Sequence, residues 1–579
     1  METYTSSGEM REKGRLLPAV TWSCAIATVL ALATVAAGKG DEAASRGNAH
    51  AVVSRIATSA AAPAPSGINV TAICQSTPYP SACETALSSS EARSGGDPFA
   101  ASVQFAMVRA ASARALARNL SASKAPRGGP AAGMRDCAEL LDVSLEQLGD
   151  ALAGSADDAD GATTWLSAAL TNQGTCNDSL AAVPASAGRE AMRRQIGALA
   201  KYISTALALH VGKVKGGNGV PPSAAPAPQS SHANTFPSWV SEHDRRLLES
   251  PATSVTPDAV VALDGSGTHR SIGEAIAAVT AEAPAGTAAS GGRGGRAAAR
   301  KVIHVKAGRY EETVRISNRH RNVMLMGDGK GKTVIIGSKS AGDGYTIFSS
   351  ATVAAMGSGF IAKGLSIVNS AGPGKGQAVA LLVGGDHSVV YQCAIEAYQD
   401  TLYTHSNRQF YAEDDIFGTV DFIFGNSAVV IQNCNIQPKK PGPAQVDVIT
   451  AQGREDPNQN TGISIHRCRI TGAPDIGGTP VYLGRPWKKY ARVVVMESSM
   501  DGSIAPAGWL EWSDPSALST LYYGEYGNTG AGAAKKRRVT WSGVHTWMST
   551  AEATEFTVGK FISGDSWLGS TGVKYTSGL

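Results

Sequence analysis

The sequence contains no Cys-x-x-Cys pair, and neither the spacing nor the neighbours of its eight cysteines indicate a zinc site. It also lacks a strong excess of either charge, because a net charge of +4 is small for 579 residues and does not indicate a nucleic-acid-binding protein. Beyond residue 37, no run is long and apolar enough to span a membrane. With 43% hydrophobic and 17% charged residues, the chain is typical of a globular protein of two or three domains.

The N-terminal segment, residues 1–65, is expected to direct export. An apolar run at 16–37 follows three basic residues, and this order predicts a cleaved secretory signal or an uncleaved anchor: Arg11, Lys13 and Arg15. Residues 38–65, rich in Ala, Ser and Gly, are interpreted as a linker. Three glycosylation sequons fit an exported chain, although such sequons also arise by chance: Asn69, Asn119 and Asn177.

Residues 66–212 are expected to form an all-α four-helix bundle. Apolar residues recur there at three- and four-residue steps, as in Met192, Ile196, Leu199 and Ile203. Several helices that each have one apolar face must bury those faces against one another, which predicts a bundle. The segment holds no catalytic constellation, so a structural or binding role is the favoured interpretation.

The early cysteines favour disulfides formed in an oxidising compartment. Cys74 and Cys83 flank a Thr-Pro-Tyr-Pro turn, close enough in sequence to join a helical hairpin. Cys137 and Cys176 could tie two longer helices. The next segment, 213–256, is rich in Pro and Gly and reads as a flexible tether. It contains a dibasic-dileucine sequence where a protease could reach the chain, although a solvated charge pair is the simpler interpretation of the residues alone: Arg245, Arg246, Leu247 and Leu248.

From residue 257 to 579 the pattern changes to short β-rich runs separated by Gly and Asn, after one helical stretch at 272–279 and a basic loop at about 283–300. A small residue followed two positions later by an aliphatic one recurs at coil-sized steps, beginning at Leu365, Cys393, Asp414, Cys434, Cys468 and Ser498. This recurrence predicts an all-β solenoid, a right-handed parallel β-helix, in which each coil buries its inward face on the next. A β-sandwich is the alternative fold, but it would show clearer hairpin turns. The basic run 535–538 is interpreted as a solvated loop.

Two aspartates occupy the same phase of successive repeats. Asp400 follows Cys393 by seven residues, and Asp421 follows Asp414 by seven. Adjacent strands of a solenoid lie about 4.8 Å apart, so the two carboxyl groups should be near neighbours that titrate as a pair. Such a pair can supply one acid and one ionised carboxylate, although turn aspartates that cap backbone groups are the simpler interpretation. Gln399 adds an amide that could stabilise an oxyanion.

The region from about 257 to the C-terminus resembles the plant pectin methylesterases, also called pectinesterases. The resemblance rests on runs in one order: GQAVAL (376–381), YQDTLYTHSNRQFY (398–411), GTVDFIFGN (418–426), VITAQGREDPNQNTG (448–462), YLGRPW (482–487), PAGW (506–509) and LYYGEYGNTGAGA (521–533). The helical region resembles the invertase and pectin methylesterase inhibitor-like domain that precedes many of these enzymes, and the four early cysteines fit its two disulfides. The segment 245–248 resembles the processing site between the two halves, where a subtilisin-like protease is expected to cut.

The resemblance implies a role for each matched residue in hydrolysis of the C6 methyl ester of galacturonate. Asp421 would be the nucleophile and Asp400 the general acid and base, while Gln377 and Gln399 would stabilise the oxyanion. Arg485 would orient Asp421, and Trp487 would offer a stacking face to the sugar. His405 is interpreted as a supporting or structural residue. No cofactor and no metal is required.

The resemblance also implies a secreted, monomeric enzyme of the cell wall, acting on pectin (methyl-esterified homogalacturonan), controlled by inhibitor proteins and, in cis, by its own bundle. Three positions depart from the family pattern, which usually has Cys at Asp414, His at Gly376 and often Thr at Ile347. Thr346 would face away from the substrate if this stretch were a strand. The bridge usually formed by Cys434 cannot form here, so this thiol is left free or pairs otherwise.

Two other functions were open from the residues alone. A solenoid pectate lyase or polygalacturonase could also use paired acids, but it would break the polymer chain rather than release methanol. A non-catalytic wall-binding or inhibitor protein, with the bundle as its working part, is the alternative from another class.

Overall fold

A computed structural model describes residues 69–88, 97–122, 131–154, 158, 160–216, 256–281 and 300–579. The expected signal and linker, the dibasic-dileucine sequence and the basic loop after residue 281 lie outside these residues. In the part of the chain that the structure describes, no helix has the length and apolar character needed to cross a membrane.

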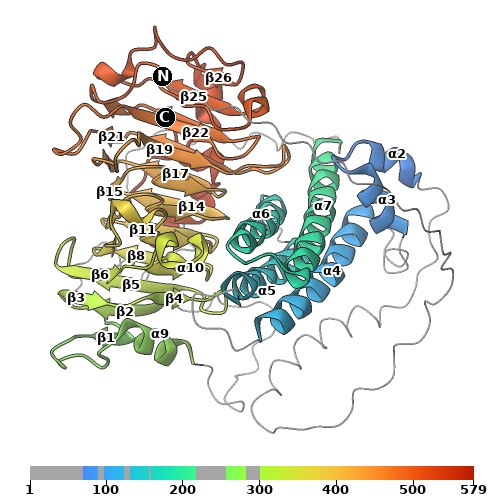
Figure 1. Cartoon of the computed structure of the whole chain (residues 1–579), viewed down its shortest axis with the longest axis horizontal. Coiled ribbons are helices and arrows are strands. Elements are labelled where there is room, and N and C mark those ends of the chain that lie inside the picture. The colour runs from blue at the N-terminus through green and yellow to red at the C-terminus, as the bar shows by residue number, and fades with distance from the viewer. Residues whose placement is uncertain are drawn as a thin grey trace, which may run out of the picture. The chain divides into compact units, whose positions relative to one another are not determined.

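Four long helices form the bundle, preceded by a short helical hairpin (Figure 1). The bounds are α2 Val70–Gln75, α3 Pro80–Ser88, α4 Pro98–Ser121, α5 Ala131–Ala153, α6 Gly161–Ala181 and α7 Ala187–Gly216. Asp97 caps α4 by accepting a hydrogen bond from the Phe99 N–H, and Pro98 stands at the first helical position, where its missing N–H costs nothing. The bundle expected from the apolar periodicity is therefore confirmed.

Two disulfides hold the bundle together. Cys74–Cys83 joins α2 to α3, and Cys137–Cys176 joins α5 to α6. The predicted apolar face of α7 is buried in the bundle core, where Met192, Ile196 and Ile203 are at most 2% exposed. The helical periodicity of the sequence thus identified the faces that pack together.

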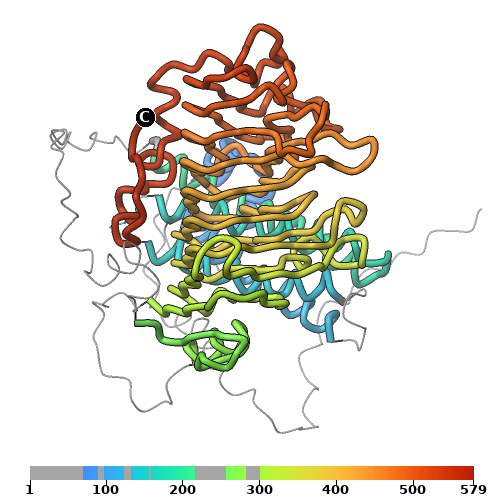
Figure 2. Tube along the Cα trace, turned by 90° about the vertical axis from the view of Figure 1, so that its left-hand side faces the viewer, coloured from blue at the N-terminus to red at the C-terminus, as the bar shows by residue number. Residues whose placement is uncertain are grey.

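The second part is a solenoid of three parallel sheets, whose stacked coils are visible in Figure 2. The largest sheet contains β1 Ala259–Val261, β2 Lys301–Val305, β5 Val323–Gly327, β8 Ile361–Lys363, β11 Ser388–Tyr391, β14 Arg408–Ala412, β17 Ala428–Gln432, β20 Gly462–His466, β23 Arg492–Met496, β25 Tyr522–Tyr526 and β26 Val544–His545. The second contains β4 Val314–Ile316, β7 Val353–Ala355, β10 Leu381–Val383, β13 Leu402–Thr404, β16 Ile423–Gly425, β19 Asp447–Gln452 and β22 Val481–Pro486. The third contains β3 Gly308–Glu311, β6 Thr333–Gly337, β9 Ser366–Asn369, β12 Ala394–Glu396, β15 Asp415–Gly418, β18 Asn435–Pro438, β21 Arg469–Ile470 and β24 Ser499–Met500.

The strand register follows the repeat that was read from the sequence. The aliphatic residues of the six repeats pair in one row along the third sheet: Ile367, Ile395, Ile416, Ile436, Ile470 and Met500. All six are buried in the core that runs through the middle of the solenoid. Because inward residues of successive coils stack in this way, the parallel β-helix is confirmed.

Short helices cap and flank the solenoid. Their bounds are α9 Ile272–Thr280, α10 Ile347–Ser350, α11 Thr550–Thr554, α12 Val558–Phe561, η2 Ala341–Asp343, η3 Pro373–Lys375, η4 Pro515–Ser519, η5 Ala531–Ala533, η6 Gly564–Ser566 and η7 Leu568–Thr571. The C-terminal segment, red in Figure 2, runs along the side of the coils. Val558, Ile562 and Trp567 pack there against the outer face of the largest sheet.

Two local expectations were wrong. Residues 346 and 347 begin the short helix α10 rather than a strand, because the Thr346 hydroxyl and the Ser349 side chain form a capping box. The basic run 535–538 is not wholly solvated, since Arg538 is 7% exposed. Its guanidinium bonds the buried Glu525 carboxylate at 2.8 Å, a partner that lies too far away in sequence to be recognised from the run itself.

Candidate active site

The two phased aspartates lie at equivalent points of neighbouring coils. Asp400 stands two residues before β13 and Asp421 two residues before β16, and Leu402 of β13 pairs with Ile423 of β16. Both aspartates have positive φ, 64° and 53°, a conformation that Asp adopts more readily than most residues. The same left-handed conformation recurs at turns of the other coils, as at Gln392 and Glu413, so it is a feature of the solenoid turns and not of these two aspartates alone.

Arg485, on β22, binds Asp421 from the side of the sheet that lies away from Asp400. Its Nε donates to Asp421 Oδ1 at 2.8 Å and its Nη2 donates to Oδ2 at 2.6 Å. Two parallel bonds fix the plane of the carboxylate as well as its position. The guanidinium in turn lies 4.1 Å from the ring centroid of Trp512, an aromatic residue that has no part in the motifs recognised in the sequence.

The two carboxyl groups differ in their electrostatic surroundings. Burial and the neighbouring Asp421 carboxylate raise the pKa of Asp400 well above its ordinary value, and Arg485 only partly opposes this. Burial also raises the pKa of Asp421, but there the Arg485 hydrogen bonds and charge act directly against it. The proton shared by this pair therefore belongs on Asp400, and Asp421 is the ionised member.

The two glutamines lie on the coils next to the aspartates. The Ala378 N–H donates to the Gln399 carbonyl oxygen at 3.1 Å, which places Gln377 and Gln399 side by side. Both side chains are half-buried, and no bond from either amide group to another described residue is found. Their amide groups are consequently available to a bound molecule.

Aromatic rings form the wall beside the carboxyl pair. Tyr403 and Phe424 stack with their centroids 4.2 Å apart, and Trp487 meets Phe424 edge-on at 6.0 Å. A Cβ at Gly453 would lie 2.8 Å from the Trp487 ring, so a glycine at this position lets the indole lie flat against the coil. Flat aromatic faces beside paired acids suit the apolar face of a sugar ring.

Comparison with known proteins identifies this arrangement. The family model for pectinesterase matches residues 258–565, which carry all six residues of the candidate site. The chain belongs to the pectinesterase family. The model for plant invertase/pectin methylesterase inhibitor matches residues 69–209, so the pectinesterase domain follows an inhibitor-like domain. The chain is thus a pectinesterase, a carboxylic ester hydrolase, with an inhibitor-like N-terminal domain.

Relatives share both parts. A probable pectinesterase/pectinesterase inhibitor from Arabidopsis thaliana, number 35, is 49% identical over 487 residues, covering 83% of this chain and 88% of the relative. Pectinesterase 2 from Citrus sinensis is 43% identical over 519 residues, covering 87% of this chain and 94% of the relative. Among solved structures, the pectin methylesterase from carrot superposes with a TM-score of 0.53 at 50% identity, covering 56% of this chain and 99% of the carrot protein.

Helix α6 of the inhibitor-like domain lies against the aromatic wall of the pectinesterase site. The Thr175 hydroxyl bonds the Tyr403 hydroxyl at 3.2 Å and His405 Nε2 at 2.9 Å. Asp178 pairs with Lys488 at 3.7 Å, next to Trp487. The space that remains between α6 and this wall is about 20 Å³, room for a water molecule but not for a sugar ring.

His405 has a structural position rather than a catalytic one. Its ring is fully buried between Thr175 and the Ser406 hydroxyl, 2.9 Å from Nδ1. Burial lowers the pKa of His405 to about 3, so the ring stays neutral. His405 therefore agrees with the expected supporting role: it is a neutral imidazole that contacts the bundle.

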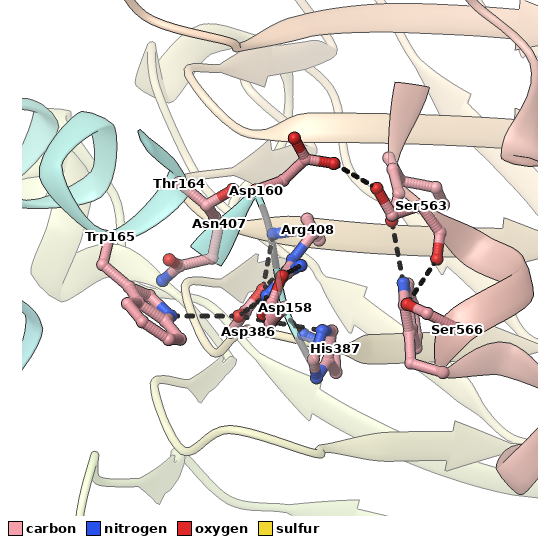
Figure 3. A network of polar contacts seen from close by, with 12 residues as sticks. Asp158, Asp160, Thr164, Trp165, Asp386, His387, Asn407, Arg408, Ser563 and Ser566 are labelled. Atoms are coloured by element: carbon pink, nitrogen blue, oxygen red, sulfur yellow. Dashed lines mark hydrogen bonds and ion pairs between the residues drawn. The ribbon is translucent and has the colours of Figure 1, made fainter. Parts of the chain in front are cut away.

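A second polar network joins the two domains beyond the aromatic wall (Figure 3). Arg408, from β14, donates to both Asp158 oxygens at 2.7 and 2.6 Å and to both Asp386 oxygens at 3.0 and 2.6 Å. Trp165 Nε1 also donates to Asp386 at 3.2 Å. Burial disfavours ionisation of Asp386, but the Arg408 charge outweighs it and holds the pKa well below its usual range. Asp158 and Trp165 belong to the inhibitor-like domain, so a buried arginine ties that domain to the enzyme.

The position that departs most from the family pattern lies seven residues before Asp421. Asp414 is fully buried, and its Oδ1 accepts the Cys393 N–H at 2.7 Å, while Oδ2 has no partner among the described residues. Burial raises the pKa of Asp414 well above its usual value, which favours the neutral form. Cys434 and Cys468 are buried free thiols, as is Cys393. The Asp414 N–H donates to Cys434 Sγ at 3.3 Å, where the family usually has a bridge.

The other two departures lie around the site. Gly376 has φ +67°, a backbone conformation that favours glycine, and open space lies where a side chain would project. Beside Ile347, the Thr346 hydroxyl bonds Asp136 of α5 and does not face a free surface. Tyr523 was also missed from the sequence: its buried hydroxyl has no partner in the described part of the chain, and the Asp421 charge helps to raise its pKa.

Proposed function

We propose that the chain demethylates pectin through a covalent intermediate on Asp421. The observation that carries the proposal is the pair of buried carboxyl groups on adjacent coils, one of them held by Arg485 in a bidentate bond. A carboxylate is a weak nucleophile, so its position and the stabilisation of the oxyanion must supply much of the rate.

In the first half-reaction, an Asp421 oxygen attacks the C6 carbonyl carbon of a methyl-esterified galacturonate. The carbonyl oxygen becomes an oxyanion, which the side-chain amides of Gln377 and Gln399 stabilise. When the intermediate collapses, the bond to the methoxy oxygen breaks, and Asp400 gives its proton to the leaving methanol. An anhydride between galacturonate and Asp421 remains.

In the second half-reaction, the Asp400 carboxylate takes a proton from water as the water oxygen attacks the galacturonate carbonyl carbon. The anhydride bond breaks, Asp421 leaves as a carboxylate, and Asp400 is protonated again. The products are a galacturonic acid unit and methanol, with the polymer length unchanged. Trp487 supports the sugar ring, and no cofactor enters these steps.

Methanol release from pectin by the tether-cleaved protein tests the mechanism. D421N and D400N should each lower the rate by roughly a hundredfold or more, whereas D514N, an exposed aspartate at the start of η4, should leave it unchanged. Polymer length is measured in the same reaction. Chain breaks without methanol, or full activity of D421N, would refute the proposal and favour a depolymerising or a non-catalytic protein.

We further propose that the inhibitor-like domain blocks the uncleaved enzyme. Helix α6 occupies the space in front of Trp487, and the Arg408 network holds the domain in place. Cleavage at Arg245–Leu248, outside the described residues, by a subtilisin-like protease would allow the domain to leave. The names of the Arabidopsis relatives, which couple pectinesterase and pectinesterase inhibitor, agree with this arrangement.

D158A tests the block in the uncleaved chain. It removes the two bonds from Arg408 to the inhibitor-like domain, while Asp386 keeps the arginine paired. A loss of about 2–3 kcal/mol should raise the open fraction, and with it methanol release, roughly thirtyfold or more. The matched control is D142A, since among the described residues Asp142 forms ion pairs with Arg114 and Arg118 of its own domain and with no residue of the solenoid. Equal activity of cleaved and uncleaved wild-type protein would remove the proposal.

The remaining proposals concern the setting of the enzyme. An exported chain of the cell wall fits the two disulfides, the substrate and the N-terminal apolar run. Among the sequons, Asn69 and Asn119 are exposed, whereas Asn177 is half-buried on α6, so the first two are the better glycan acceptors. We expect a monomer whose partners are pectin, the processing protease and separate inhibitor proteins.

A further inference from the structure

An open groove lies on the inhibitor-like domain and is lined by none of the α6 residues that contact the pectinesterase site. It runs between the α2–α3 hairpin and α7 and has a volume of about 680 Å³. Figure 1 shows the hairpin beside one end of α7. The Cys74–Cys83 disulfide cross-links the hairpin that forms this wall of the groove. No step of the proposed mechanism uses this surface.

The α7 side of the groove is basic. Arg193, Arg194 and Lys201 line it, all three side chains are exposed, and none forms an ion pair with a carboxylate in the part of the chain that the structure describes. Arg194 and Lys201 are two helical turns apart and therefore lie on one face of α7. Gly197 and Ala198 lie between them, and no atom lies within 4 Å of a Cβ placed at Gly197. Small residues thus keep the floor open between the cations.

The hairpin side presents an aromatic ring. Tyr79 is 41% exposed, between Pro78 and Pro80, and the Lys201 ammonium lies 5.8 Å from its ring centroid. The two flanking prolines restrict the backbone on either side of the tyrosine. Partial burial and the nearby charges of Asp456 and Glu455 raise the pKa of Tyr79, so the phenol stays neutral. Those two acids follow β19, so the tyrosine end of the groove faces the loop that borders the catalytic cleft.

Exposed cations around a small-residue floor and an exposed aromatic face match the chemistry of an acidic polysaccharide. The cations meet carboxylates, and the tyrosine ring meets the apolar face of a sugar. We propose that this groove binds stretches of demethylated galacturonan, the acidic product of the pectinesterase domain. A methyl-esterified stretch has no charge to offer the three cations, so the groove distinguishes product from substrate. It would hold the uncleaved chain on pectin that has already been processed.

Binding of a demethylated oligogalacturonate to the uncleaved full-length chain tests the proposal by calorimetry. R193Q/R194Q/K201Q should weaken binding roughly tenfold or more, since three ion pairs are lost. The matched control removes three exposed charges elsewhere on the same domain and should bind as the wild type: R109Q/R135Q/K213Q. Y79A should weaken binding several-fold, whereas Y79F, which keeps the ring, should not.

Two further ligands decide the specificity. A methyl-esterified oligogalacturonate of the same length should bind at least tenfold more weakly, and so should polyglutamate of matched charge. Equal binding of polyglutamate would overturn the proposal in favour of an acidic peptide or general polyanion surface. Wild-type affinity in R193Q/R194Q/K201Q, or an equal loss in the control triple, would overturn it as well. Methanol release by the cleaved variants should remain at the wild-type rate, which keeps this test separate from that of the mechanism.

Discussion

D414C should restore a cross-link that the sequence has lost and stabilise the solenoid. Asp414 lies opposite Cys434, because the next residues, Asp415 and Asn435, pair in register on β15 and β18. Neighbouring strands are about 4.8 Å apart, within the range of Cα separations that a disulfide spans. The change also removes a buried carboxyl group whose Oδ2 has no partner among the described residues.

The magnitude can be worked from the loop that the new bridge closes. Residues 414 and 434 are 20 apart in sequence, and closing a loop of that size restricts the unfolded chain by about 3 kcal/mol. Loss of the unpaired carboxyl oxygen adds about 1–2 kcal/mol, and loss of the bond to the Cys393 N–H removes about 1 kcal/mol. The net expectation is about 3–4 kcal/mol, which should raise the melting temperature of the solenoid by several degrees.

Differential scanning calorimetry of oxidised D414C measures the shift, with D414C/C434S as the control that has the same new residue but cannot form the bridge. Mass spectrometry after alkylation of the unfolded chain reports whether the Cys434 thiol has been consumed. A bridged D414C that melts at the wild-type temperature, or a Cys434 thiol that stays reactive, would refute the reasoning about register and burial at this position.

Three further predictions follow from the described contacts. Burial under α6, beside Lys488, Asp178 and Asp456, raises the pKa of Glu455 to about 7. Docking of the inhibitor-like domain therefore binds a proton, and the docking equilibrium becomes more favourable as pH falls through about 7 and levels off below the ordinary Glu pKa of about 4.3. Methanol release by the uncleaved chain, relative to the cleaved chain, should rise from about pH 5 to about pH 8, and E455Q should flatten this pH profile. W487A should raise KM for pectin more than it lowers kcat, because it removes a sugar-supporting face and no reacting group; steady-state kinetics of the cleaved enzyme check this. R538A leaves the buried Glu525 carboxylate without its counter-ion, although the Trp509 Nε1 bond remains, and should destabilise the solenoid by about 3–5 kcal/mol in denaturant titrations. K536A, at an exposed site in the same run, should change the stability little.

The stacking order of the solenoid could be predicted because it depends on a short local repeat in the sequence. A small residue, one spacer and an aliphatic residue recur once per coil, and the six aliphatic residues from Ile367 to Met500 fall in one row of the sheet. The phase of Asp400 and Asp421 follows from the same repeat. A slip of one residue would turn the inward row outward, so burial fixes the register strongly.

Other features depend on contacts between residues far apart in sequence. Nothing around Arg408 indicates that Asp158, 250 residues earlier, will share its guanidinium with Asp386. The helix at Ile347 escaped prediction because its capping box, Thr346 with Ser349, is brief and sits between strands. Charge alone suggested that the run 535–538 was solvated, yet a partner 13 residues away buries Arg538.

The contacts between α6 and the aromatic wall join two parts of one covalent chain, and this sets how the block responds to dilution. While the tether is intact, closure is a unimolecular step, and the local concentration of the inhibitor-like domain does not depend on how much protein is present. Dilution therefore leaves the uncleaved enzyme closed. Once the tether is cut, binding through the same contacts is a bimolecular equilibrium. The concentration of the two fragments, and so the volume into which they diffuse, then determines what fraction of the enzyme is active.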